Sequence, residues 1–244
     1  MKYSILLPYY KRLGHLHNSF ISLIYHYSDR DDYEVVIAED SKNVRNKEDH
    51  DGLLNTISKF SDRIKIIHST VSTETWNPVL GFNEAASRAS GEYFIVTNPE
   101  CFHATNIFRG LDEEFEKDPN SYVICSSRNF KGCKFFIDEY KDLGGKEAEW
   151  YQHSVYRNEN FHFCTAISKK NWFNIGGFDN KYALGIAYDD ADFRNSVYKA
   201  RLPVKVRDDL FTIHIDHNSF PSPPNAPILV NKNRITYQMK WESK

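Results

Sequence analysis

Short hydrophobic runs alternate with helix-like patterns along the first half of the chain. Apolar residues fill segments 3–7, 33–38, 64–68, 93–97 and 122–126, which indicates buried strands. Between these runs, segments 15–27, 53–60, 78–89 and 104–117 have the character of helices. The alternation predicts an α/β fold in which helices cover both faces of a mostly parallel central sheet.

The pattern becomes less regular in the second half. Residues 128–160 are polar and irregular with several aromatic side chains, which is typical of a functional or mobile loop. Further on, we expect a strand within 160–168, a helix over 190–200 and a strand over 210–215. Four prolines within residues 221–227 predict a stiff extended segment, followed by a short helix over 230–241. We therefore expect one domain over residues 1–218, with the C-terminal segment 219–244 packing on it or extending it.

The ends of three predicted strands carry polar or aromatic residues. In open α/β sheets, ligands bind at the carboxyl ends of the strands. This rule points to residues 8–10, 39–40 and 98–100 as the wall of a binding site. The chain contains neither GxGxxG nor GxxxxGK[ST], so a dinucleotide-binding fold and a P-loop NTPase are both unsupported.

Three carboxylates, Asp189, Asp190 and Asp192, follow a Gly-Gly turn at residues 176–177. Like charges this close raise the pKa of at least one carboxyl group unless a cation or hydrogen-bond donors hold it. Such a cluster often provides a base or a clamp for a polar ligand. The alternative is an acidic first turn of a helix, which fits Asp192 best, because a helix N-terminus favours a carboxylate.

Composition narrows the class of protein. With 244 residues and 41% hydrophobic residues the chain can bury a large core. A net charge of −2 without a basic run argues against a nucleic-acid partner. We expect no signal peptide and no transmembrane segment, because no apolar run is long enough. The four cysteines show no CxxC pairing, which predicts reduced thiols in a cytoplasmic protein, with a Cys125–Cys133 bridge as the alternative. Peripheral attachment to a membrane is the alternative for localisation.

Taken in order, these features resemble glycosyltransferase family 2, whose members use nucleotide sugars and have the GT-A fold. The resemblance rests on the three strand ends, on segments 81–86 and 91–96, on Gly-Gly-Phe-Asp at 176–179, on the acidic cluster and on His214 and His217. It covers residues 1 to about 218. The last part is also similar to a galactosyltransferase-type C-terminal segment. The resemblance implies inverting transfer of a sugar from a nucleotide diphosphate, expected to be UDP, to a hydroxyl of a glycan or related acceptor.

The resemblance also implies roles for individual residues. Asp190 corresponds to the base that takes the proton of the acceptor hydroxyl, and Asp189 and Gly177 are expected to contact the acceptor. The residues expected to bind the nucleotide sugar are Pro8, Tyr9, Tyr10, Asp40, Asn83 and Asn98. The alternatives are local packing for the two tyrosines, a turn cap for Asp40, and a helix cap for Asp192. Trp76 is expected in the core or under the sugar, and Asp179 in a structural role.

The expected metal site departs from the family pattern. Most members carry Asp-x-Asp after the fourth strand, whereas this chain has Asn98-Pro99-Glu100, which also favours a turn. Glu100 and His217, with His214 as the alternative, are the ligands that the resemblance implies for Mn²⁺ or Mg²⁺. Positions 214 and 217 would face opposite sides of a continuous strand, so we expect only one of them at the ion.

Two other functions stay open. A nucleotidyltransferase shares the early strand–helix pattern, but it would carry a glycine-rich basic loop, and here Lys11-Arg12 is followed by Gly14 alone. A non-catalytic protein that binds a sugar or nucleotide is favoured only by Asn98. The loop at 128–160 and the Pro-rich tail leave an oligomer contact open as well.

Overall fold

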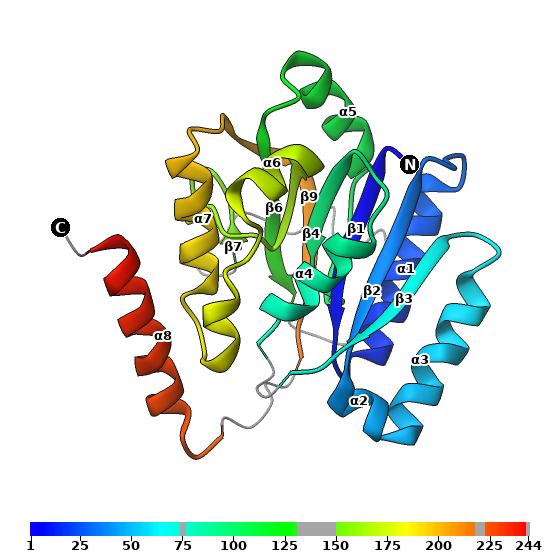
Figure 1. Ribbon diagram of the computed structural model, residues 1–244. Helices are drawn as coiled ribbons and strands as arrows, with labels where there is room; N and C mark the ends of the chain where they lie inside the picture. Colours follow the sequence, from blue (N-terminus) through cyan, green and yellow to red (C-terminus); the bar gives the residue numbers. More distant parts are fainter. Residues whose placement is uncertain (74–76, 131–149, 218–222, 243–244) are drawn as a thin grey trace.

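The computed structural model describes residues 1–73, 77–130, 150–217 and 223–242 (Figure 1). Trp76, Cys133, most of the aromatic-rich loop and the first part of the Pro-rich segment lie outside the described residues.

A mixed sheet runs through the molecule in the order β3-β2-β1-β4-β8-β6-β9-β5, with β7 paired to β6 (Figure 1). The strands are β1 (Tyr3–Tyr9), β2 (Tyr33–Asp40), β3 (Lys65–Val71), β4 (Tyr93–Thr97), β5 (Cys101–His103), β6 (Tyr122–Phe130), β7 (Trp150–Gln152), β8 (Cys164–Ser168) and β9 (Val204–Ile215). Strands β1 to β4 pair in parallel, and β8 lies antiparallel between β4 and β6. The carboxyl ends of β1, β2 and β4 therefore meet at one edge.

Helices cover both faces of this sheet, which confirms the predicted α/β fold. They are α1 (Leu13–Tyr27), α2 (Ser41–Arg45), α3 (Lys47–Phe60), α4 (Val79–Arg88), α5 (Ile107–Lys117), α6 (Lys169–Ile175), the 3-10 helix η3 (Asn180–Leu184), α7 (Asp189–Lys199) and α8 (Ala226–Trp241). Side chains of α1, α3 and α5 form one hydrophobic cluster with Ile5 and Leu7 of β1. Those of α4, α6 and α7 form another with Leu6. The two cores follow from strand geometry, because successive side chains point to opposite faces.

The short elements are the ones that the sequence pattern does not predict. Strands β5 and β7 have 3 residues each, and helix α2 has 5, so none of them spans enough positions to show a period. The bounds of helix α6 are instead determined by the residues that cap its two ends. The side chain of Ser168 accepts a hydrogen bond from the Asn171 N–H (3.2 Å), and Gly176 ends the helix in the left-handed region (φ 86°).

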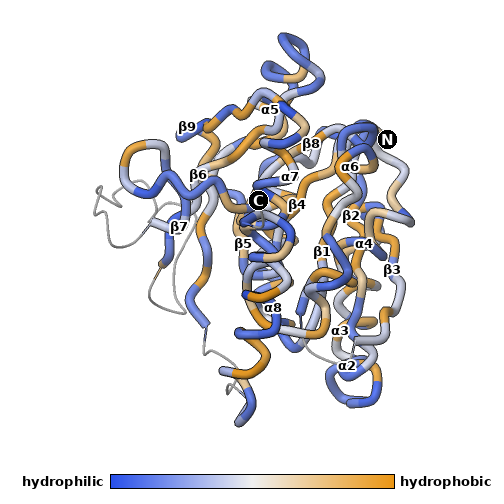
Figure 2. Tube along the Cα trace, turned by 60° about the vertical axis from the view of Figure 1, so that its left-hand side comes forward, coloured by the Kyte–Doolittle hydropathy of each residue, from blue (hydrophilic) through white to orange (hydrophobic). Residues whose placement is uncertain are grey.

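The C-terminal helix α8 packs at one end of the molecule, beyond α7 (Figure 1). The Asn233 side chain is fully buried and donates to the carbonyls of Tyr182 (3.1 Å) and Ala187 (2.8 Å). Hydrophobic and hydrophilic residues alternate along α8 (Figure 2), and Ile228 and Met239 on its outer side are each 71% exposed. No helix within the described ranges is both long and apolar enough to cross a membrane.

Candidate donor pocket and acidic cluster

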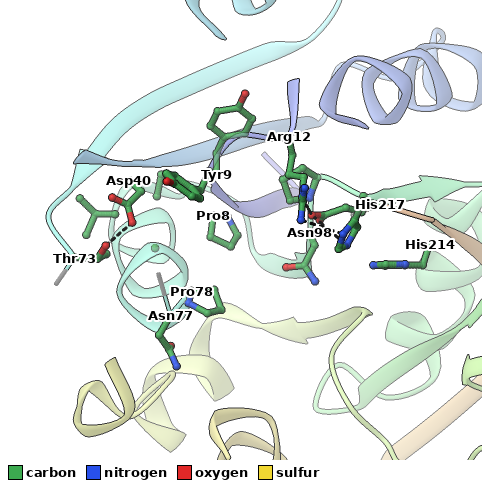
Figure 3. A pocket seen from close by; sticks show the side chains of 16 residues that line it. Pro8, Tyr9, Arg12, Asp40, Thr73, Asn77, Pro78, Asn98, His214 and His217 are labelled. Atoms are coloured by element: carbon green, nitrogen blue, oxygen red, sulfur yellow. Dashed lines mark hydrogen bonds and ion pairs between the residues drawn. The ribbon is translucent and has the colours of Figure 1, made fainter. Parts of the chain in front are cut away.

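A pocket of about 400 Å³ opens at the edge where the carboxyl ends of the parallel strands meet (Figure 3). Its volume is in the range of small-molecule sites. The structure brings together here Pro8, Tyr9, Tyr10, Asp40, Asn98, Glu100, His214 and His217, all of which the sequence predicts for the donor or the metal. Arg12, Thr73 and Asn77 also line the pocket.

Asp40 is fixed at one end of the pocket. Its side chain accepts hydrogen bonds from the Lys42 N–H (2.7 Å) and from the Thr73 hydroxyl, and it caps α2. The capping alternative is therefore realised, while Asp40 also lines the pocket. The preceding residue, Glu39, is fully buried and is held by His50 and His68 away from the pocket. Carboxylate oxygens have several acceptor positions, so Asp40 keeps the capacity to bind the N–H of a base.

An arginine occupies the other end. Figure 3 shows Arg12, Asn98 and His217 on one side of Pro8, with Asp40 on the other. Arg12 Nε donates to Glu100 Oε1 (2.8 Å), and Arg12 Nη2 donates to His217 Nδ1 (3.0 Å). The side chains of Arg12 and Glu100 are only 12% and 11% exposed. Sequence reasoning missed this role for Arg12, although a basic pair directly after a strand end is the signal that could have indicated it.

The arrangement around Glu100 and His217 does not fit a divalent cation. Arginine has donors only, so Nδ1 of His217 must accept, and the neutral ring then carries its proton on Nε2. Neither ring nitrogen then has a lone pair available for an ion, and the Glu100 charge is already paired with Arg12. Across the described ranges, no group of three or more His, Cys, Asp or Glu residues is placed to hold a metal. Glu100 and His217 do lie together as predicted, with 3.7 Å between Glu100 Oε1 and His217 Nε2. The group that both of them contact is the guanidinium of Arg12.

His214 and His217 line the same pocket, contrary to the expectation that they face opposite sides. The reason is that β9 ends at Ile215, so the alternation of a strand does not extend to His217. Their ring centroids are 5.2 Å apart. His214 is 8% exposed, and burial lowers its pKa to about 4, so it is neutral at physiological pH.

The acidic cluster lies beside the pocket, at the start of α7. Asp189 is 7% exposed, and the side chain of Asp190 is 44% exposed. Burial, reinforced by the charge of Asp190, raises the pKa of Asp189, while a hydrogen bond from Asn77 opposes that rise. Partial burial likewise raises the pKa of Asp190. Asn77 connects the acidic cluster to the pocket, because it also lines the pocket.

His162 supports Asp190 and was not singled out from the sequence. Its Nε2 lies 3.4 Å from Asp190 Oδ1, and its ring packs against Phe82, Phe178 and Phe193. Burial lowers the pKa of His162 to about 4, so the ring is neutral. An isolated histidine in an irregular segment gives no pattern that would mark it.

Asp192 is not the cap of α7 that the sequence suggested. Its carboxylate is buried and accepts hydrogen bonds from the Tyr182 hydroxyl (3.1 Å), Trp241 Nε1 (2.7 Å) and Lys240 Nζ (2.9 Å). Asp192 therefore ties α8 to α7. Asp179 is structural as expected, since it caps η3 and also binds Lys240 (2.9 Å).

Asn83 and Gly177 are absent from the lining of the donor pocket. The Asn83 amide donates to the Phe178 carbonyl (2.7 Å) and accepts from the Phe178 N–H (3.1 Å), so it fixes the Gly-Gly-Phe-Asp turn to α4. A Cβ on Gly177 would lie 2.8 Å from Asn83 Oδ1 and 2.9 Å from Trp172 Nε1. Close packing accounts for both positions, and the expected contacts of Asn83 with the nucleotide sugar and of Gly177 with the acceptor stay predictions. An asparagine inside a helix suggests function, but here it satisfies backbone groups of a turn.

The family model of glycosyl transferase family 2 matches residues 4–180. The chain belongs to this family. The matched range contains β1 to β8 and the Gly-Gly turn, and it ends before the acidic cluster and His217. The family roles of Asp189, Asp190 and His217 therefore stay predictions. No curated protein matches the sequence.

Solved structures share the GT-A fold of this family member at low sequence identity. S. aureus TarS 1–349 has a TM-score of 0.65 at 14% identity and matches 88% of this chain. GalNAc-T7 with UDP, GalNAc and Mn²⁺ has a TM-score of 0.70 at 14% identity and matches 99%. The mannosyltransferase PcManGT from Pyrobaculum calidifontis, with GDP-Man and Mn²⁺, has a TM-score of 0.59 at 15% identity and matches 91%. The present chain covers only 60%, 48% and 57% of these three chains, respectively.

Proposed function

We propose that this chain is an inverting glycosyltransferase that moves a sugar from a UDP-linked donor to a hydroxyl of a glycan or related acceptor. The observation that carries the proposal is the position of Asn77, which lines the pocket and also interacts with the Asp189 carboxyl group, whose pKa it lowers. A donor in the pocket would therefore lie next to a pair of partly buried carboxylates. Membership of glycosyl transferase family 2 supports the same activity.

Exposure favours Asp190 over Asp189 as the base. An acceptor hydroxyl must reach the carboxylate, and 44% of the Asp190 side chain is exposed, whereas Asp189 is 7% exposed. In the proposed step, Asp190 takes the hydroxyl proton as the oxygen bonds to the anomeric carbon. The bond from that carbon to the phosphate oxygen breaks, and its electron pair leaves with UDP. A carboxylate whose pKa is raised is a stronger base, and neutral His162 can donate Nε2–H to hold its orientation.

UDP is favoured by the contacts that Asp40 already makes. Both of its oxygens accept one hydrogen bond each, from Lys42 N–H and the Thr73 hydroxyl. Uracil presents a single N–H, so one remaining acceptor position suffices, whereas the adjacent donors of the guanine edge need the remaining positions of both oxygens to lie along the same edge of the carboxylate. TarS 1–349 has been solved with UDP and with UDP-GlcNAc. We assign no step to a divalent cation, because Arg12 engages both residues predicted to hold it.

The Asp190→Asn variant tests the base assignment. We expect transfer to fall by about 10²–10⁴-fold, the usual contribution of a general base. UDP affinity should stay within about twofold, because Asp190 does not line the pocket. Transfer is measured by UDP release in the presence of acceptor, and affinity by calorimetry.

The matched control is Asp62→Asn, which removes an exposed carboxylate outside the pocket. It should change neither quantity. Normal turnover in Asp190→Asn would reject Asp190 as the base. Failure of the unaltered protein to bind any nucleotide sugar would reject the proposed function itself.

A further inference from the structure

We propose that Arg12 takes the place of a divalent cation in this chain and holds the diphosphate of the donor without an ion. The inference rests on the proposed function, since it concerns how the same pocket binds a nucleotide sugar. A diphosphate needs positive charge at the end of the pocket opposite Asp40, and Arg12 brings a guanidinium to that end (Figure 3).

The backbone positions Arg12 for this role. Lys11 adopts a left-handed conformation (φ 50°) that turns the chain at the end of β1, and Arg12 is then the N-cap residue of α1. The first N–H groups of a helix carry partial positive charge and favour anions. The guanidinium and the start of α1 therefore place their charge at the same edge of the sheet.

Glu100 and His217 hold the guanidinium instead of an ion. Arg12 Nε contacts Glu100 (2.8 Å) and Nη2 contacts His217 (3.0 Å), which fixes the plane of the fork along the pocket wall. A planar guanidinium recognises phosphate oxygens through paired hydrogen bonds. Because Arg12 is only 12% exposed, its charge is less screened than on an open surface.

The same contacts explain why a metal would compete poorly. An ion at Glu100 would displace Arg12 and leave a partly buried guanidinium without its carboxylate, which is costly. His217 would have to move its proton from Nε2 to Nδ1, where Arg12 donates. Asn98 has replaced the first carboxylate of the family motif, so it adds no charge to attract the ion.

In the transfer step, Arg12 donates hydrogen bonds to the phosphate oxygen that receives the electron pair of the breaking bond. No proton moves from Arg12, because guanidinium stays protonated at any working pH. The positive charge stabilises the leaving diphosphate as its charge develops.

The first test compares UDP affinity with and without metal. Calorimetry of the unaltered protein should give UDP dissociation constants within about twofold in EDTA and in MnCl₂. In EDTA, Arg12→Met should weaken UDP binding by about tenfold or more, because it removes a charge-assisted contact. Binding of uridine, which has no phosphate, should not change in this variant. Arg109→Met, on α5 and with an 82% exposed side chain, is the matched control.

The second test uses Glu100 and His217, which lose their contacts with the guanidinium in the Arg12→Met variant. Without Arg12, both Glu100 and His217 can turn to an ion, so MnCl₂ should restore part of the UDP affinity lost by Arg12→Met. Glu100→Gln should tighten UDP binding to the metal-free protein, because it removes a negative charge beside the diphosphate and keeps an acceptor for Arg12. With MnCl₂ present, a metal site built on Glu100 predicts that the same variant binds UDP more weakly than the unaltered protein, whereas the role of Arg12 predicts that it does not.

The outcomes separate this inference from the proposed function. Loss of UDP binding by the unaltered protein in EDTA, with recovery in MnCl₂, would overturn the role of Arg12 and leave the glycosyltransferase proposal standing. Weaker UDP binding by Glu100→Gln than by the unaltered protein in MnCl₂ would overturn it as well, and this result does not depend on whether Arg12→Met folds. If the unaltered protein bound no nucleotide sugar in either buffer, the proposed function would fail, and this inference with it.

Discussion

Asp189 and Asp190 are neighbours in the chain, but water reaches them very differently. Asp189 begins α7 and is 7% exposed, while 44% of the Asp190 side chain is exposed. Ionisation of a buried carboxyl group costs more free energy than in water, so its pKa rises, and the charge of a neighbouring carboxylate adds to that rise. The two aspartates therefore suit separate tasks, one as an orienting group and one as a base.

This difference predicts how stability depends on pH. The raised pKa of folded Asp189, against about 3.9 when unfolded, means that the folded state binds more protons between these values. The stabilising contribution is complete below the unfolded pKa and is lost as pH rises through the folded pKa. We expect Asp189→Asn to be more stable than the unaltered protein at about pH 8, by on the order of 1 kcal/mol. The difference in the free energy of unfolding between Asp189→Asn and the unaltered protein should shrink as the pH falls toward about 4.

Urea unfolding at several pH values measures this effect, with Asp62→Asn as the control for loss of one charge. A stability difference between Asp189→Asn and the unaltered protein that is constant with pH would contradict the burial argument. Circular dichroism at each pH verifies that both proteins start from the same fold.

At the scale of elements, α8 is joined to the domain by polar contacts rather than by a wide apolar face. Asn233 is buried against η3, and Gly185 approaches it so closely that a Cβ there would lie 2.1 Å from Asn233 Oδ1. Further along, Lys240 and Trp241 bind Asp192 in α7. The helix that begins with the acidic cluster is thus held in place by α8.

A double-mutant cycle at Gly185 and Asn233 tests this attachment. We expect Asn233→Ala to lower the free energy of unfolding by about 1–3 kcal/mol, because it leaves two buried carbonyls without donors. Gly185→Ala should also destabilise, through the clash with Asn233. The combined variant should be little worse than Asn233→Ala alone, because the clash is gone. Simple additivity of the two effects would contradict the packing. Asn231→Ala, on the exposed side of α8, is the control.

At the scale of the whole molecule, the donor would join the two ends of the pocket and stabilise the entire domain. A ligand that binds only the folded state raises the melting temperature, and at equal concentration the tighter ligand raises it more. In a thermal-shift series we expect UDP and UDP-sugars to raise the melting temperature more than GDP and GDP-sugars at equal concentration. A larger shift with GDP compounds would contradict the argument made from the contacts of Asp40.

The sequence predicts which strand ends line the site better than it predicts which side chains contact one another there. Parallel strands must align their carboxyl ends, so the segments at 8–10, 39–40 and 98–100 could be placed together without coordinates. The partners of Arg12 lie 88 and 205 positions away, and no local pattern encodes such contacts. The same limit explains Asn83, whose turn is 95 positions distant, and Asp192, whose partners are in α8. Residue type indicates polar chemistry, but only the fold decides which polar groups are already satisfied.

The three-way contact of Asp192 with Lys240 and Trp241 has a consequence for how this sequence can change over generations. Loss of Asp192 would leave Trp241 Nε1 without its acceptor, and loss of Lys240 would leave the buried carboxylate without its cation, so viable lineages should change these positions together or retain them. Drift in the distant C-terminal helix is thereby tied to selection on the helix that carries Asp190. An outer segment that contributes no residue to the pocket lining would then evolve as slowly as the helix that carries the acidic cluster.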